Sequence, residues 1–126
     1  DVYFEKIPPE KDPIKYFTFI AFFPQLVAGP IERASELLPQ FNQLKKNHLE
    51  NFYVGLKIII IGLFLKSFIA DSIAPFTDQI FINYSNFNGG TLLLGAIGFT
   101  IQIYGDFAGY SLVARGVAKL LGVELM

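Results

Sequence analysis

Asp106 is the residue whose chemical type and position most clearly indicate a function. It follows the strongly apolar stretch 91–104, and an ionisable group within an apolar helix costs about 2.5–3.5 kcal/mol on membrane-insertion scales. Such groups normally face the interior of a helix bundle or a water-filled cavity. Gln102 and Tyr110 lie four residues to either side, so the three side chains share one helix face. We predict a functional role for Asp106; in the alternative, it pairs with a Lys, an Arg or a backbone donor merely to hold helices together.

Other residue types that support catalysis give weaker signals. The single histidine, His48, lies in a polar run at a predicted helix start, which favours a surface position over general-base catalysis. Ser35 and Ser111 have no base nearby in the sequence to activate them. The chain has no Cys, which excludes disulfides, thiolate metal sites and Cys nucleophiles, and one His cannot build a zinc site alone. We therefore predict no metal site and no bound cofactor.

The composition indicates a membrane protein rather than a soluble domain. Hydrophobic residues make up 52% of the 126 residues and charged residues only 17%, with a mean hydropathy of +0.45. Soluble domains typically carry about 25% charged residues. Ten Lys and Arg against eleven Asp and Glu leave a net charge of −1, so no basic field exists to bind nucleic acid. We expect membrane lipid, and not nucleic acid, to surround this chain.

Two segments are long and apolar enough to cross a membrane, which takes about 20 apolar residues in a helix. They are residues 91–110 and residues 52–70. Lys57 and Lys66 interrupt the second segment, and each can extend its ammonium toward the nearer membrane surface. In the alternative, this helix lies obliquely at the membrane interface.

The sequence after residue 70 predicts the end of the second helix. Asp71, Ser72 and Pro75 interrupt the apolar pattern, and Pro cannot donate a backbone hydrogen bond. Residues 73–83 are then expected to form a short re-entrant or surface segment.

Residues 16–31 form a third apolar run, preceded by the polar N-terminal segment 1–15. The run is short for a span, and Pro24, Gly29 and Pro30 interrupt its helix. Non-helical backbone at membrane depth is tolerated only inside protein or beside a water-filled cavity. We predict a re-entrant element here.

Residues 110–122 are amphipathic and predict an interfacial helix. Ser111, Arg115 and Lys119 form a polar stripe at four-residue spacing, with apolar residues elsewhere. Gly122 is the expected C-terminal stop. In the alternative, this is an ordinary amphipathic helix packed against neighbours in the full protein.

Together these segments predict an all-α fold, with about two spanning helices, a re-entrant segment and interfacial amphipathic helices in one partial domain over 1–126. Basic residues in 32–51 and 111–126, and none in 71–90, place the first two segments in the cytoplasm and the third outside. The chain begins without Met, so we expect an internal fragment of a longer, multi-pass protein.

Several long motifs resemble the membrane-bound O-acyltransferase family, and within it the branch that acetylates alginate. They are FFPQLVAGPI followed by ERASELLPQF at 22–41, KSFIAD at 66–71, IQIYGDFAGYS at 101–111 and ARGVAKLLG at 114–122. The resemblance covers nearly all of residues 16–126, in the family's order. Asp106 matches the aspartate of the family's Asp-Phe-[Ser/Ala]-Gly-Tyr element.

The resemblance implies a bacterial inner-membrane enzyme that moves acetyl groups from a cytoplasmic donor, acetyl-CoA or an acyl carrier, across the membrane to an extracellular polysaccharide such as alginate. It implies an extracytoplasmic acetyltransferase partner and a catalytic His beyond residue 126, so the fragment alone is expected to be inactive. Asp106 takes the catalytic position, beside substrate-binding Gln102 and Tyr110. The cytoplasmic approach is expected to be lined by Phe22, Pro24, Gln25, Gly29 and Pro30.

Two other functions fit parts of the pattern. Transfer of D-alanine to teichoic acid belongs to the same enzyme class, and the motifs look more like the acetylating branch. A polytopic transporter or flippase subunit is the alternative from another class, because broken helices and an intramembrane Asp also suit ion-coupled transport.

Overall fold

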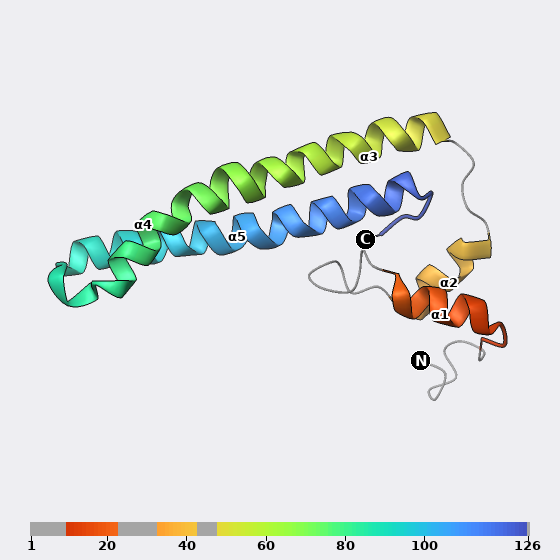
Figure 1. The fold of residues 1–126 in the computed structure, drawn as a ribbon, viewed down its shortest axis with the longest axis horizontal. Coiled ribbons are helices and arrows are strands. Elements are labelled where there is room, and N and C mark those ends of the chain that lie inside the picture. The colour runs from red at the N-terminus through yellow and green to blue at the C-terminus, as the bar shows by residue number, and fades with distance from the viewer. Residues whose placement is uncertain (1–9, 23–32, 43–47, 126) are drawn as a thin grey trace. The chain divides into compact units, whose positions relative to one another are not determined.

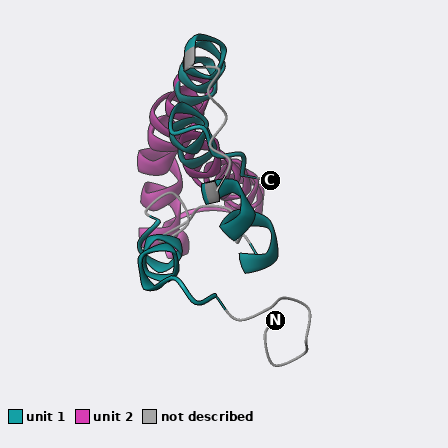
Figure 2. Ribbon diagram, turned by 90° about the vertical axis from the view of Figure 1, so that its right-hand side faces the viewer, with its two compact units in different colours: residues 1–59, 114–126 teal, residues 60–113 magenta. Residues whose placement is uncertain are grey.

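The computed structural model describes residues 10–22, 33–42 and 48–125 of the chain. The chain divides into two compact units, residues 1–59 with 114–126 (unit 1) and residues 60–113 (unit 2) (Figure 2). Every regular element in the described ranges is helical, which confirms the predicted all-α fold. The elements are α1 (Pro13–Ala21), α2 (Ala34–Asn42), α3 (His48–Leu63), the π-helix η2 (Phe64–Ala70), α4 (Asp71–Ile82), the 3₁₀-helix η3 (Tyr84–Asn86) and α5 (Gly89–Leu120).

The helix predicted over 52–70 does not end at Asp71. It continues through η2 and α4 as one helical run, Leu49–Ile82, of 34 residues (Figure 1). The predicted stop and the predicted re-entrant or surface segment 73–83 are therefore wrong. Pro75 lies within α4, soon after the π-helical turns, and both a π-bulge and a proline can bend a helix without ending it.

The two helices predicted over 91–110 and 110–122 are one helix, α5, of 32 residues. No Pro lies within it. Its glycines lower helix propensity without ending the helix, and several of them pack closely against the other long helix. Asn88 precedes it, and the Asn88 side chain accepts hydrogen bonds from the Thr91 backbone N–H (2.9 Å) and hydroxyl (3.0 Å). Gly122, at φ 83°, ends the run as predicted, because this left-handed conformation suits glycine.

Both long helices exceed what a bilayer requires. Runs of 34 and 32 residues extend to about 50 Å at 1.5 Å per residue, against a hydrocarbon core of about 30 Å. Among the described residues these two helices are long and apolar enough to cross a membrane. Large apolar side chains such as Leu93, Phe68 and Ile60 are more than half exposed, as expected for surfaces that contact lipid or further helices.

Facing glycines bring α5 close to the other long helix in both units. In unit 1, a Cβ carbon on Gly55 would lie 2.8 Å from the Gly116 carbonyl oxygen. In unit 2, a Cβ carbon on Gly62 would lie 2.7 Å from the Gly109 carbonyl oxygen. Small residues at such contacts let helix backbones approach and pack in a membrane.

The core of unit 1 lies where its short helices meet the chain after α5. The buried side chains are Phe22, Leu37, Ala118, Val123 and Leu125. The Gln40 side chain fixes this chain segment, because its amide donates to the Glu124 carbonyl (2.9 Å) and accepts from the Glu124 N–H (2.8 Å). The predicted re-entrant segment 16–31 begins within α1, and its residues 23–32 lie outside the described residues.

Candidate active site

Lys66 links two carboxylates in unit 2. Its Nζ lies 2.7 Å from Asp106 Oδ1 on α5 and 2.7 Å from Asp71 Oδ1 at the start of α4. The Lys66 and Asp106 side chains are 37% and 39% exposed, so the pair is accessible to further protein or to a ligand. One cation between two carboxylates leaves the cluster with a net charge of −1.

The π-helix explains how Lys66 reaches Asp71. In an α-helix, residues five apart point roughly 140° away from each other, at about 100° per residue. A π-helix closes its turns with hydrogen bonds between residues five apart. The Asp71 N–H donates to the Lys66 carbonyl in this way, so the two side chains lie on the same side of the helix. π-Helical turns occur frequently at functional sites.

Gln102 makes a second polar contact between α5 and α4. The Thr77 hydroxyl donates to Gln102 Oε1 at 2.6 Å, and the Thr77 residue is 0% exposed. The same hydroxyl lies 2.9 Å from the Ala74 carbonyl oxygen, so its single hydrogen is shared between the α4 backbone and Gln102. Thr77 and Lys66 thus fix the orientation of two neighbouring polar side chains on α5, Gln102 and Asp106.

Tyr110 lies at a cavity of about 270 Å³ in unit 2. Its lining is mostly apolar and consists of Leu63, Lys66, Gly109, Tyr110 and Val113. Lys66 therefore belongs to this cavity and also contacts Asp106. The arrangement places an ion-paired carboxylate next to an apolar space with a phenol at its edge.

The chemistry available to this cluster is binding and orientation. A Lys ammonium carries three hydrogens, and two contacts to carboxylates are seen here. An ionised carboxylate has about four lone-pair sites, so Asp106 can accept a further hydrogen bond while paired to Lys66. Among the described residues, no group of three His, Cys, Asp or Glu side chains could hold a metal ion.

The structure places three of the predicted site residues together. Asp106, Gln102 and Tyr110 all lie on α5 in unit 2, as their spacing indicated. The ion pair with Lys66 is the kind of contact that the alternative, structural role of Asp106 predicts. The roles assigned to these three residues stay predictions.

Of the five residues predicted to line the cytoplasmic approach, Phe22 lies among the residues that the structure describes. Phe22 is buried in unit 1, where its ring packs edge-on against Phe41 with centroids 5.6 Å apart. Its substrate-binding role stays a prediction. The predictions for Pro24, Gln25, Gly29 and Pro30 lie outside the described residues.

Lys66, Asp71 and Thr77 are the residues that sequence reasoning missed. Lys66 was expected to extend to a membrane surface, which is wrong because its ammonium binds Asp106 and Asp71 instead. The signal for the pair was available, since lone opposite charges in two apolar helices are expected to find each other. Asp71 and Thr77 gave no such signal, because their contacts depend on a π-helix and on a helix that continues past Pro75.

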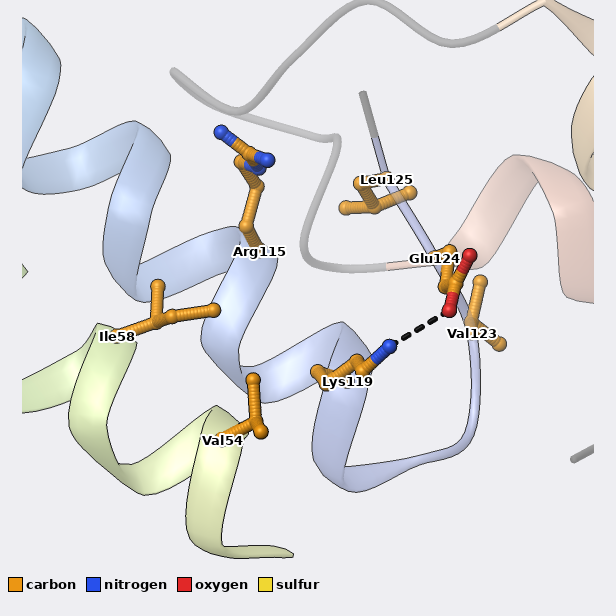
Figure 3. Close-up of a pocket in the computed structure, with 7 residues that line it drawn as sticks. All are labelled: Val54, Ile58, Arg115, Lys119, Val123, Glu124 and Leu125. Atoms are coloured by element: carbon orange, nitrogen blue, oxygen red, sulfur yellow. Dashed lines mark hydrogen bonds and ion pairs between the residues drawn. The ribbon is translucent and has the colours of Figure 1, made fainter. Parts of the chain in front are cut away.

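Unit 1 holds a second cavity, of about 260 Å³ (Figure 3). Apolar side chains and two cations line it, and Lys119 is ion-paired to Glu124 at 2.6 Å. The lining residues are Val54, Ile58, Arg115, Lys119, Val123, Glu124 and Leu125. None of the predicted site residues lies here.

Comparison with known proteins identifies the family. The model of the membrane-bound O-acyltransferase family matches residues 9–126. The probable alginate O-acetylase of Azotobacter vinelandii is 38% identical over 126 residues, which cover 100% of this chain and 25% of that protein. The peptidoglycan O-acetyltransferase of Helicobacter pylori is 37% identical over 114 residues, covering 89% of this chain and 22% of that protein.

A relative of lower identity is named for the transfer of a different group, D-alanine. The teichoic acid D-alanyltransferase of Bacillus subtilis is 28% identical over 110 residues, covering 84% of this chain and 27% of that protein. No solved structure matches the chain. The chain spans about a quarter of the length of the curated relatives it matches. From the family match over residues 9–126 and the two apolar helices, this is a membrane protein, and it belongs to the membrane-bound O-acyltransferase family.

Proposed function

We propose that this chain is part of an enzyme that O-acetylates an extracellular polysaccharide such as alginate. The observation that carries the proposal is 36–38% identity to five probable alginate O-acetylases over the whole chain. The ion-paired Asp106 between two apolar helices supports it, because acyl transfer needs a shaped site that excludes water.

Two alternative functions have weaker support. Transfer of D-alanine to teichoic acid is supported by a relative at 28% identity, lower than the identities to the O-acetylating relatives. The family match argues against a transporter or flippase subunit. Peptidoglycan is an acceptor of the Helicobacter pylori relative, so the test below includes it.

In the proposed reaction, a hydroxyl oxygen attacks the carbonyl carbon of an acyl thioester from acetyl-CoA or an acyl carrier. The new ester bond forms as the carbon–sulfur bond breaks, and the hydroxyl proton passes through a general base to the departing thiolate. The resemblance implies that this base is a His beyond residue 126. Asp106 then shapes and polarises the site beside it, with Gln102 and Tyr110 contacting substrate.

The proposed setting is the bacterial inner membrane, crossed several times by the full-length protein. Within the segment 71–90, the turn between the two long helices, at residues 83–88, faces the outside. The chain that follows α5 faces the cytoplasm, where the acyl donor arrives. The proposed partners are membrane lipid, the polysaccharide acceptor and an extracytoplasmic acetyltransferase protein that completes the transfer. The charge distribution supports this orientation, since Lys and Arg are absent from 71–90.

The test is complementation with the full-length protein. We expect it to restore acetyl groups to alginate in a bacterium whose own alginate O-acetylase has been deleted, and not to acetylate peptidoglycan in a strain that lacks that activity. If peptidoglycan acetylation alone is restored, the acceptor is peptidoglycan and not alginate. Restoration of neither, with the protein present in the membrane, would contradict the proposal.

A further inference from the structure

Lys66 lies close enough to Asp106 to fix the position of its carboxylate. Its Nζ is 2.7 Å from Asp106 Oδ1, and its side chain also lines the cavity that Tyr110 borders. We propose that Lys66 is a positioning residue for Asp106, whose carboxylate it holds in place beside this cavity. The inference rests on the proposed function, because it assigns Lys66 a task in acetyl transfer.

The backbone of Lys66 is held in place, which restricts the positions that its ammonium group can reach. A Cβ carbon placed on Gly109 would lie 3.0 Å from both the Lys66 Cβ and the Lys66 backbone nitrogen. The Lys66 carbonyl also accepts the Asp71 N–H in the π-helix. Packing against α5 and a hydrogen bond within η2 therefore hold the residue on both sides.

Lys66 supplies the positive charge that lies between the two carboxylates of this cluster. Asp106 and Asp71 are its two carboxylate partners, and without the cation two acidic groups would face each other. A carboxylate that loses its cation also loses the short charge-assisted contact that fixes its orientation.

Lys57 provides a matched control for Lys66. Both are lysines within the same helical run Leu49–Ile82. Lys57 is exposed and has no ion pair among the described residues. Substituting each by Met in the full-length protein removes the same charge from the same kind of apolar surroundings.

A disulfide reports whether the helices still pack. A Cβ carbon on Gly95 would lie 3.4 Å from the Ile80 Cβ, close to the spacing of roughly 3.5–4.5 Å in a disulfide. Cysteines at these two positions, detected as a cross-linked peptide by mass spectrometry, therefore report contact between α4 and α5. The chain itself contains no competing Cys.

The experiment measures alginate acetyl content and the 80–95 cross-link in the same membranes. We expect Lys66→Met to lower acetylation by about 100-fold, the loss that a displacement of roughly 1 Å can cause in an active site. Lys66→Arg should restore part of the activity, and Lys57→Met should match the parent. In the exchange Lys66→Asp with Asp106→Lys, the cross-link should form while acetylation stays absent.

Three results would overturn the proposal. They are parental acetylation by Lys66→Met, restored acetylation in the variant that exchanges Lys66 and Asp106, and loss of the 80–95 cross-link in both of these variants. The last two would make the pair a purely structural contact. Failure of the proposed function is distinguishable, because the parent protein itself would then not acetylate alginate, and the role of Lys66 in that reaction would be overturned with it.

Discussion

Gly62 and Gly109 face each other across unit 2 with no room for a side chain on either. A Cβ carbon on Gly62 would lie 2.7 Å from the Gly109 carbonyl oxygen, and one on Gly109 would lie 2.8 Å from the Gly62 carbonyl oxygen. Gly109 also faces the backbone of Lys66. The close approach of these backbones therefore lets Lys66 on one long helix reach Asp106 on the other.

Gly109→Ala should destabilise the protein. The added methyl group meets backbone atoms, which cannot move aside as the end of a flexible side chain can, and overpacking of this kind costs about 1–3 kcal/mol. We expect a lower Tm for the full-length protein in detergent. Gly89→Ala is the control, because nothing lies within 4 Å of a Cβ carbon at Gly89. Equal Tm values for the two variants would contradict the packing described here.

The contact between Thr77 and Gln102 should be measurable as a coupling between two substitutions. Thr77→Val and Gln102→Leu each remove one end of the 2.6 Å hydrogen bond. Hydrogen bonds between membrane helices contribute about 0.6 kcal/mol on average and up to about 1.7 kcal/mol in double-mutant cycles. We expect the double variant to be more stable than the sum of the single effects predicts.

Thr100→Val supplies the control for that cycle. Thr100 also lies on α5, but it is exposed and its hydroxyl donates to the Ala96 carbonyl within the same helix. Its effect should add to that of Gln102→Leu. Strict additivity for Thr77→Val and Gln102→Leu would show that the helices do not share this hydrogen bond.

Gln40 should hold the chain after α5 in place within unit 1. Loss of the Gln40 side chain removes both hydrogen bonds to Glu124, each worth about 1 kcal/mol. We expect the Glu124 amide to exchange with deuterium roughly fivefold faster in Gln40→Ala, on the basis of one such bond. The exposed Gln79 provides the control substitution, Gln79→Ala.

The Val123 amide is the internal reference for the exchange experiment. It donates to the Ala118 carbonyl at 2.9 Å, whereas the two bonds that Gln40 makes here go to Glu124. Unchanged exchange at Glu124 in Gln40→Ala would mean that the Gln40 contacts do not protect this segment.

The proposed orientation in the membrane can be tested by labelling single cysteines. Ser85 lies in η3, between the two long helices, and Leu121 follows α5. Both residues are exposed, and the chain contributes no Cys of its own. A membrane-impermeant thiol reagent should label Ser85→Cys in intact cells and Leu121→Cys only after permeabilisation. The reverse pattern would invert the topology.

The sequence was informative about the helices because apolar length is a strong signal. Apolar runs around residues 52–70 and 91–110 correspond to helices that are long enough to span a bilayer. Asp106 stood out for the same reason, as a lone charge beside an apolar stretch. These predictions required only composition and helical periodicity.

Helix ends and contact partners depended on information that local sequence lacks. Pro75 was expected to end a helix, but it is accommodated just after a π-helix that packs against α5. Periodicity assumes 3.6 residues per turn, so it could not bring Lys66 and Asp71 to the same side. The change from an apolar to an amphipathic pattern near residue 110 suggested two helices, although no residue there stops α5.

The most direct test of the central claim is the acetyl content of alginate made with Asp106→Asn in the full-length protein. Asp78→Asn serves as the control, because Asp78 is an exposed acidic residue of α4 with no ion pair among the described residues. We predict a loss of at least about 100-fold for Asp106→Asn, in the range of a group that takes part in the chemistry, with parental acetylation for Asp78→Asn. Parental acetylation by Asp106→Asn, at a normal protein level in the membrane, would contradict the functional role of Asp106.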